Sequence, residues 1–320
     1  MHEFQIINNY FKKLTKNNKN ALNLNDDVFF DKKNKLIVSV DTYVEGNHFV
    51  NFQKPDLVIK KILRSSISDL ICKGVVPQYY FVSGSGNKNN FSRSNLSKIS
   101  KSLNHEQKKY NIFLGGGDTV FSEKLSFTIT SIGYSHNIVY RNRAKQDDDL
   151  YVTGNLGDSY MGLLVLKKKL KLSNFQNKYF VNKYYKPEIH LSLANELKNF
   201  ASSSIDVSDG LFADLEKLIN NLNVSYQVLL KDIPISKNLS LIINSGNFSK
   251  KNLISNGDDY QILFTAPKSK RLKINNLSKS LKIRITKIGK IFSKAYKSRL
   301  LDEKNVSIGL KNKGYFHSFS

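Results

Sequence analysis

Short runs rich in β-branched residues alternate along this chain with stretches of helical spacing, and this alternation limits its possible folds more than any other feature. Between Pro55 and Lys73, apolar residues recur at helical spacing, with proline at an acceptable helix start and Gly74 just beyond the end. The strand-like runs are KLIVSVD (35–41), LSFTITSIGY (125–134), LYVTG (150–154) and QILFTAP (261–267). Strands that alternate with helices predict an α/β or α+β fold.

The length of the chain and one polar segment indicate two domains. A chain of 320 residues is long enough for two domains of about 150 residues, each with its own core. The segment RNRAKQDDDLYVTG (141–154) turns strongly polar before a new strand begins. We therefore expect an N-terminal domain over residues 1–140 and a C-terminal domain over residues 141–320.

The net charge raises the question of a polyanionic partner. Lysine and arginine outnumber the acidic residues by 50 to 26, which gives a formal net charge of +24. Such a charge is typical of proteins that bind nucleic acid or an anionic membrane. The lysines, however, are spread along the chain rather than clustered on one element, so we expect neither partner.

The sequence also bears on location and redox chemistry. It has no apolar run of the ~18 residues that a membrane span needs, and its N-terminus does not have the organisation of a signal peptide. We expect a soluble, cytoplasmic protein. Cys72, the only cysteine, lies among apolar neighbours, which predicts a small core residue and excludes an internal disulfide.

Aspartate recurs at strand ends and strand-to-helix turns of this acid-poor chain. Each such aspartate alone has an ordinary explanation, because its side chain bonds nearby backbone N–H groups in turns and at helix N-termini. The recurrence of short carboxylates at stiff strand ends favours Mg²⁺, which prefers oxygen ligands and completes its shell with water and substrate phosphate. The aspartates concerned are Asp26, Asp27, Asp41, Asp69, Asp118, Asp206, Asp209, Asp258 and Asp259.

Two glycine-rich segments offer backbone N–H groups to a phosphate. GGGDT (115–119) follows a predicted strand, and GNLGDS (154–159) precedes a predicted helix. Neither is a Walker P-loop, and no G-x-G-x-x-G follows a strand in the manner of a Rossmann unit. Together with the aspartates, they predict binding of a Mg-nucleotide by a fold of another kind.

The motifs, in their order along the chain, resemble those of the thiamine-monophosphate kinase family, within the superfamily of aminoimidazole-ribonucleotide synthetase-like ATP-binding proteins. The resemblance extends from about residue 24 to the C-terminus. It rests on NDDV, VSVDTYVEGNHF, SDLICKGVVP, GGGDT, VTGNLGDSYMGL, IDVSDGL, GDDYQILFT and the terminal GYFHSF.

This resemblance implies transfer of the ATP γ-phosphoryl group to thiamine phosphate, giving thiamine diphosphate and ADP. It also implies a homodimer formed through the N-terminal sheet, with ATP in the cleft between two α/β domains. By motif position, the Mg²⁺ ligands would be Asp27, Asp41, Asp69, Asp118, Asp206 and Asp209. The ATP contacts would be Gly117, Asp118, Arg141 and Ser208. The thiamine phosphate contacts would be His48, Asp258 and Tyr315. No residue is assigned as a general base, because the acceptor is already an ionised phosphate.

The chain departs from the family pattern at four positions, and other readings stay open. The departures are Asn25 in place of glycine, Ser66 in place of asparagine, and Asp258 and Gln261 in place of glutamate.

Two alternative functions stay open. The first is that of another ATP-dependent enzyme of the same superfamily, and the second is that of a basic nucleic-acid-binding protein. On spacing alone His48 fits a hydrogen-bonded structural histidine, and Arg143 competes with Arg141 as the ATP-binding cation.

Overall fold

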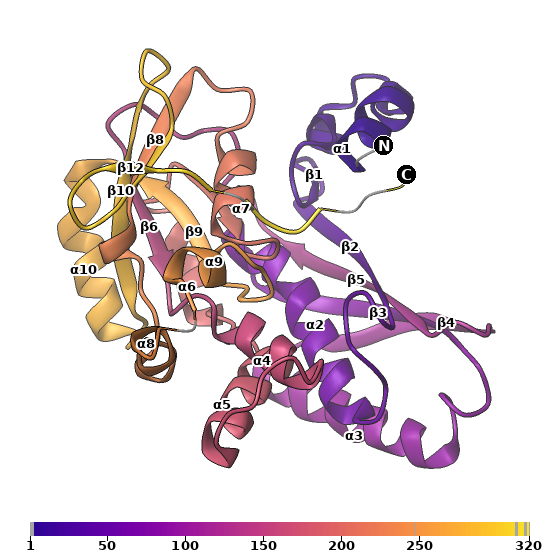
Figure 1. The fold of residues 1–320 in the computed structure, drawn as a ribbon. Helices are drawn as coiled ribbons and strands as arrows, with labels where there is room; N and C mark the ends of the chain where they lie inside the picture. The colour runs from indigo at the N-terminus through magenta and orange to yellow at the C-terminus, as the bar shows by residue number, and fades with distance from the viewer. Residues whose placement is uncertain (1–2, 247, 311–312, 317–318, 320) are drawn as a thin grey trace.

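The computed structural model describes residues 3–246, 248–310, 313–316 and 319. In these residues the chain forms two β-sheets, and no strand of one sheet pairs with a strand of the other. The predicted α/β fold is confirmed (Figure 1). No helix of the described part has both the length and the apolar character needed to cross a membrane.

The first sheet has the strand order β1-β2-β5-β3-β4, in which only β3 and β4 run parallel. The alternation predicted for β2 and β5 is present, because Ile37, Ser39 and Phe127 are buried while residues between them are more exposed. One face of the sheet packs on helices and the other is open. The strands are β1 (Phe29–Asp31), β2 (Leu36–Val44), β3 (Pro77–Gly86), β4 (Phe113–Phe121) and β5 (Ser126–Tyr134).

The glycine-rich segment GGGDT lies inside strand β4, whereas the sequence had predicted a loop after a strand. Glycine fits here because the backbones of β3 and β4 approach closely. A Cβ atom on Gly117 would lie 1.8 Å from the carbonyl oxygen of Val82, and one on Gly115 would lie 2.7 Å from the ring of Phe81. The glycines therefore serve strand pairing, and the segment is part of a strand rather than a turn after one.

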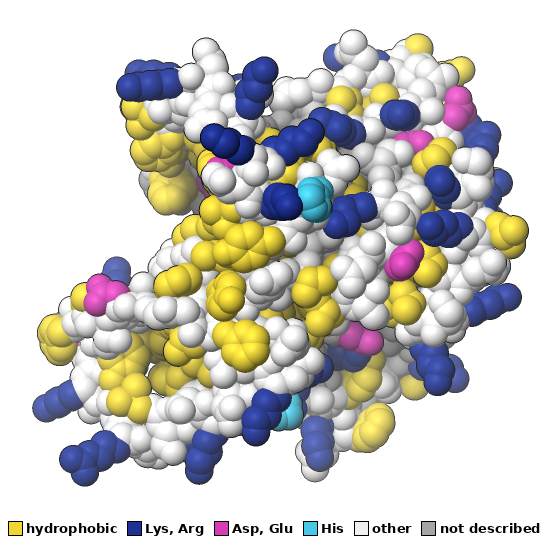
Figure 2. Space-filling model, turned by 180° about the vertical axis from the view of Figure 1, so that it is seen from behind, with side chains coloured by type: hydrophobic (Ala, Val, Ile, Leu, Met, Phe, Trp, Pro, Cys, Tyr) yellow, Lys and Arg dark blue, Asp and Glu magenta, His cyan; other side chains and the backbone are white. Residues whose placement is uncertain are grey.

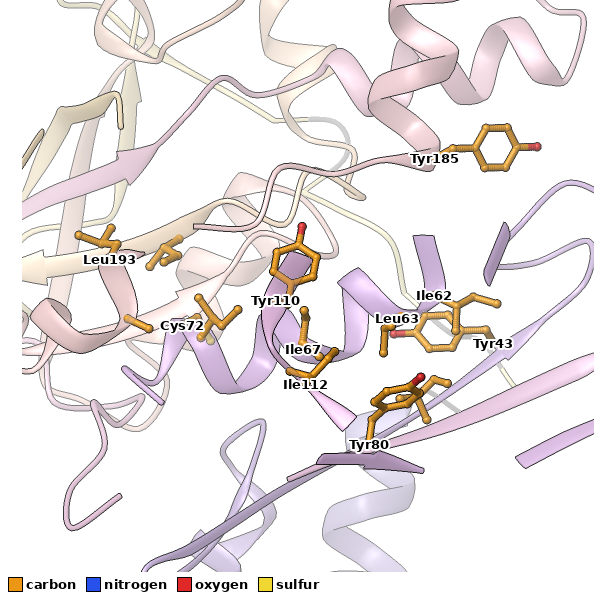
Figure 3. Close-up of a cluster of buried hydrophobic side chains, with 14 of the residues drawn as sticks. Tyr43, Ile62, Leu63, Ile67, Cys72, Tyr80, Tyr110, Ile112, Tyr185 and Leu193 are labelled. Atoms are coloured by element: carbon orange, nitrogen blue, oxygen red, sulfur yellow. The ribbon is translucent and has the colours of Figure 1, made fainter. Parts of the chain in front are cut away.

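Helix α2 (Pro55–Cys72) is the central helix of the molecule, and its predicted bounds are confirmed. It packs against β2 and β5 on one side and against β7, α5 and α6 on the other. Figure 3 shows Ile62, Leu63, Ile67 and Cys72 of this helix within the buried cluster that surrounds it. Helix α3 (Arg93–Tyr110) packs beside α2.

The second sheet has the strand order β12-β11-β8-β10-β6-β9-β7 and carries helices on both faces. Its strands are β6 (Asp149–Thr153), β7 (Ser203–Asp206), β8 (Val224–Leu229), β9 (Ile262–Ala266), β10 (Ile285–Ser293), β11 (Arg299–Leu301) and β12 (Ser307–Ile308). Its helices are α4 (Asp158–Leu166), α5 (Asn174–Tyr185), α6 (Leu191–Leu197), α7 (Leu211–Leu218), α8 (Lys237–Asn244), α9 (Lys250–Ile254) and α10 (Arg271–Ser280). Strands β6, β7 and β9 are buried along their whole length.

Both ends of the chain lie on the same side of the molecule (Figure 1). The N-terminal segment consists of α1 (Glu3–Ile6) followed by a π-helical turn (Ile7–Phe11) and 3-10 turns (Lys12–Thr15 and Lys19–Leu24). The C-terminal segment passes α7, where Lys313 accepts a hydrogen bond from the backbone of Ala213. This route brings residues from the end of the chain to the site described next.

Candidate functional site

A cleft of about 610 Å³ is lined by residues from both halves of the chain. Helix α2, the end of β2, the turn after β7 and the loop before β9 all contribute to its walls. Nine of the residues predicted from the sequence line it: Asp27, Asp41, His48, Asp69, Arg141, Ser208, Asp209, Asp258 and Tyr315. Positions far apart in the sequence are therefore brought to one site.

Asp41 and Asp69, which line the cleft, and the buried Asp206, which does not line it, have hydroxyl partners. Asp41 accepts a hydrogen bond from Tyr43 (3.2 Å), and Asp206 accepts one from Ser68 (2.7 Å). Asp69, near the end of α2, accepts a hydrogen bond from Ser39 of β2. Among the described residues, no ion pair reaches any of these three aspartates.

The pKa values of these carboxylates are raised mainly by burial. Burial raises the pKa of Asp206 to about 6 and also raises that of Asp41. Burial, followed by the charges of Asp41 and Asp206, raises the pKa of Asp69 well above its usual range. Converging carboxylates that oppose their own ionisation fit a divalent cation with hard oxygen ligands such as Mg²⁺.

Asp27 has different partners from those three. Arg141 forms an ion pair with Asp27 and donates its backbone N–H to Asp26 (3.0 Å). Lys73, the residue after α2, places its Nζ 2.8 Å from Asp26 and 2.7 Å from Asp27. Lys73 is fully buried, and nothing in its sequence context had indicated this role.

One group of side chains has the spacing of a metal site within the described residues. Asp27, Cys72 and Asp206 each offer a ligand atom, and these atoms lie within 4.8 Å of one another. Cys72 is buried, as predicted, and burial raises the pKa of its thiol well above the usual range. A neutral thiol is a poor ligand for Mg²⁺, so the two carboxylates are the relevant members of this group.

The turn after β7 holds Asp209 at the cleft wall. Lys217 of α7 forms ion pairs with Asp209 and with Asp214, whose carboxylate also accepts the backbone N–H of Asp209 (2.9 Å). Tyr315 donates its backbone N–H to the carbonyl oxygen of Asp209 (2.9 Å). Gly314 permits this contact, since a Cβ atom there would lie 2.3 Å from Ala213. The C-terminal segment is thereby fixed against the cleft.

His48 lies in the loop after β2, and its ring is oriented by the backbone. Its Nδ1 accepts the N–H of Val44 (3.0 Å), which places the proton of the neutral imidazole on Nε2. Tyr184 of α5 donates its hydroxyl to the carbonyl oxygen of His48 (3.2 Å). His48 is therefore both held by hydrogen bonds, as the structural alternative required, and positioned in the cleft wall.

Asp258 is connected to the same region through Lys61. The Nζ of Lys61, fully buried on α2, lies 2.6 Å from Asp258 and 4.0 Å from the ring centroid of Tyr184. Asp258 has a φ of 70°, and its backbone N–H bonds to the carbonyl oxygen of Ser208 (2.8 Å). Lys61 links the two halves of the chain, and the sequence offered no signal for it.

Gly117 and Asp118 do not line the cleft of their own chain. Asp118 is exposed on β4 and lies in register with Ser83, Thr128 and Thr42 across the first sheet. Three strand spacings of about 4.8 Å separate β4 from β2, so Asp118 and Asp41 are on the order of 14 Å apart along the sheet. One Mg²⁺ ion, with oxygen ligands about 2.1 Å away, cannot bind both within one chain.

The second glycine-rich segment, GNLGDS, also differs from its predicted role. It does begin a helix, with Gly157 (φ 88°) at the N-cap of α4. The buried carboxylate of Asp259, however, accepts the backbone N–H groups of Gly157 (2.7 Å) and Ser159 (3.4 Å). An aspartate thus fills the position at which a phosphate had been expected.

Comparisons with known proteins agree with the motif order. Residues 24–135 match the family model described as AIR synthase related protein, N-terminal domain. The thiamine-monophosphate kinase of Buchnera aphidicola subsp. Schizaphis graminum is 35% identical over 99% of this chain and 98% of the relative. The chain belongs to the thiamine-monophosphate kinase family. The Haemophilus influenzae kinase is 30% identical, again over 99% of this chain and 98% of its own length.

Solved structures of this family have the same fold. A structure described as AaThiL complexed with AMPPCP and TMP has a TM-score of 0.84 and 24% identity, and covers 99% of this chain and 97% of the other. The thiamine-monophosphate kinase of Stenotrophomonas maltophilia has a TM-score of 0.78 and 25% identity, with coverages of 96% and 98%. The hydrogenase maturation protein HypE of E. coli shares the fold at a TM-score of 0.69 and 18% identity, with coverages of 96% for both chains.

Proposed function

We propose that this cleft binds ATP and thiamine monophosphate and transfers the γ-phosphoryl group of ATP to the phosphate of thiamine monophosphate, giving thiamine diphosphate and ADP. The chain's membership of the thiamine-monophosphate kinase family supports this reaction. The proposal rests on one observation: Asp41 and Asp69 line the same cleft as His48 and Asp258.

The main obstacle to this reaction is electrostatic. Two unit charges ~4 Å apart repel each other by about 4 kcal/mol at an effective dielectric constant near 20, and both substrates carry phosphate. Mg²⁺, held by Asp41, Asp69 and Asp206, would supply the positive charge that offsets this repulsion. The acceptor phosphate is already ionised, so the cleft needs positioning groups rather than a general base.

We assign these positioning roles to further residues that line the cleft. Arg141 and Ser208 line it together with Asp27 and Asp209, which suits the nucleotide phosphates. His48 carries its proton on Nε2 when neutral and can donate it to the phosphate of thiamine monophosphate. Asp258 and Tyr315 offer a carboxylate and an aromatic face, which suit the cationic thiazolium ring of the same substrate.

We further propose that two copies associate through the open face of the first sheet. This face exposes large apolar side chains, among them Val40 (60%), Phe113 (57%) and Val120 (50%). Figure 2 shows hydrophobic side chains gathered at the lower left, the side on which this sheet lies in that view. A second copy on this face would bring its Gly117 and Asp118 toward the cleft that they cannot reach within their own chain. The cytoplasmic location expected from the sequence stays a prediction.

The reaction is tested directly with purified protein, ATP, thiamine monophosphate and Mg²⁺. We expect thiamine diphosphate and ADP in equal amounts, measured by liquid chromatography, and no product in the presence of excess EDTA. A protein that makes no thiamine diphosphate, but consumes ATP with a substrate of another enzyme of the superfamily, contradicts the proposal.

The role of His48 is tested by the substitution His48→Gln. In this assignment His48 contacts thiamine monophosphate and not ATP. We therefore expect the KM for thiamine monophosphate to rise about tenfold, which corresponds to one lost charge-assisted hydrogen bond. The KM for ATP should change little. His105→Gln is the matched control, since His105 is an exposed residue of α3. Equal effects of His48→Gln on both KM values would remove His48 from the acceptor site.

A further inference from the structure

The carboxylates around the cleft fall into two groups that differ in charge balance. Asp26 and Asp27 are paired with two cations, Lys73 and Arg141. Asp41, Asp69 and Asp206 are bonded to hydroxyl groups instead. The need for added positive charge is therefore concentrated at the second group.

Lys73 is placed as a bound cation would be. Its three N–H donors have three oxygen partners, namely Asp26 Oδ1 (2.8 Å), Asp27 Oδ2 (2.7 Å) and the backbone carbonyl of Ser204 (2.9 Å). The side chain is completely buried, and the backbone of Lys73 is also fixed, because its carbonyl oxygen accepts the N–H of Val139 (2.9 Å).

The ammonium group of Lys73 contacts one member of a possible metal site, Asp27. Carboxylate oxygens of Asp27 and Asp206 are within 4.8 Å of each other and of the Cys72 sulfur. Ser204, whose carbonyl Lys73 contacts, lies on the same strand, β7, as Asp206. The two carboxylates within 2.8 Å of its Nζ pair with Lys73 as an ammonium group.

We propose that Lys73 is a resident cation that takes the place of a divalent ion beside Asp27, leaving Asp41, Asp69 and Asp206 as the Mg²⁺ ligands of this chain. This inference rests on the proposed function, because it assumes that Mg²⁺ binds at those three aspartates. It assigns Asp27 to a pair with Lys73 and Arg141 rather than to a metal ion.

The substitution Lys73→Met tests the proposal, since methionine has a similar length and no charge. Mg²⁺ binding is measured by isothermal titration calorimetry without nucleotide, and Tm is measured in EDTA and in Mg²⁺. We expect the variant to bind one more Mg²⁺ ion per chain than the wild type. Its Tm should fall by several degrees in EDTA and recover in Mg²⁺. An unchanged number of ions, with equal Mg²⁺ effects on both proteins, would overturn the proposal.

Two further variants make the result decisive. Lys61→Met removes another fully buried ammonium of the same region, whose partner is Asp258, and should bind no additional ion. Asp27→Asn combined with Lys73→Met removes the opposite charges together and should fold in EDTA without the additional ion. Retention of that ion in the double variant would place it elsewhere and overturn the proposal.

The variants can also differ in whether they fold at all. If Lys73→Met can be purified as folded protein only in buffers that contain Mg²⁺, the result supports the proposal. Failure of both the single and the double variant to fold in either buffer would show that Lys73 acts through packing alone, and would overturn it. The kinase assay on the wild type tests the proposed reaction independently of these binding measurements.

Discussion

The buried, ionised carboxylate of Asp206 destabilises the folded state, and a bound cation would remove this destabilisation. Its pKa of about 6 exceeds the ordinary aspartate value of 3.8, so the folded state binds this proton more tightly than the unfolded state does. The resulting penalty is absent below pH 4, grows between pH 4 and 6, and is complete above pH 6. A shift of this size corresponds to roughly 3 kcal/mol.

The substitution Asp206→Asn removes this penalty and keeps an acceptor for Ser68. In EDTA at pH 7.5 we expect the variant to have a higher Tm than the wild type, and the difference should vanish below pH 4. In Mg²⁺ the order should reverse, because the variant lacks a ligand. The control Asp147→Asn, at an exposed ion pair with Lys290, should leave the Tm nearly unchanged in both buffers. A lower Tm of Asp206→Asn in EDTA would show that its charge is already balanced.

Single residues differed in how well the sequence predicted them. Asp41, Asp69 and Asp206 follow from local pattern, because each lies at or near the end of a strand or helix whose period can be read. Lys61 and Lys73 could not be predicted. The acid that pairs with Lys61 is 197 residues away in the sequence, and only tertiary structure makes it a neighbour.

Helices α2 and α3 are joined by a buried ion pair between Arg64 and Glu106. The guanidinium contacts both carboxylate oxygens (2.7 and 3.2 Å) and also donates to the carbonyl oxygen of Pro187 (3.1 Å). Glu106 is fully buried, so its removal would leave an uncompensated cation inside the molecule. This contact helps to hold the central helix, on which Asp69 lies.

Glu106→Ala should lower the free energy of unfolding by about 3 to 5 kcal/mol, as expected for one half of a buried pair. Urea unfolding followed by circular dichroism measures this change. Glu188→Ala is the control, because the pair of Glu188 with Lys183 is exposed and should contribute less than about 1 kcal/mol. Similar losses for the two variants would mean that the Arg64 pair does not anchor α2.

At the level of elements, periodicity predicted helix α2 and strands β2, β5, β6 and β9. It failed at β4, where glycines were interpreted as a turn. Their reason is the close approach of β3, a neighbour that comes from another part of the chain and that local sequence cannot reveal. The helix start at Gly157 was predicted correctly. The carboxylate that binds the N–H groups at this helix start belongs to Asp259, which is about a hundred residues away in the sequence.

At the scale of the whole molecule, the fold class followed from the sequence, and the homodimer through the N-terminal sheet that the family resemblance implies stays a prediction. The strands of the first sheet end at Tyr134 and those of the second begin at Asp149, while the division at residues 140 and 141 stays a prediction. The position of Asp118, exposed on β4 and separated from the cleft, is explained if each site takes Asp118 from the other copy of a dimer.

Heterodimers of two inactive variants test this arrangement. Asp69→Asn and Asp118→Asn are co-expressed with different affinity tags, and the mixed dimer is isolated by using both tags in turn. If the sites are shared, one cleft of this dimer contains both substitutions and the other contains neither, so activity should be about half that of the wild-type dimer. Pairing Asp69→Asn with Asp41→Asn is the control, because each cleft then carries one defect and should be inactive. A mixed Asp69→Asn and Asp118→Asn dimer without activity, or a chain that stays monomeric by light scattering, contradicts a shared site.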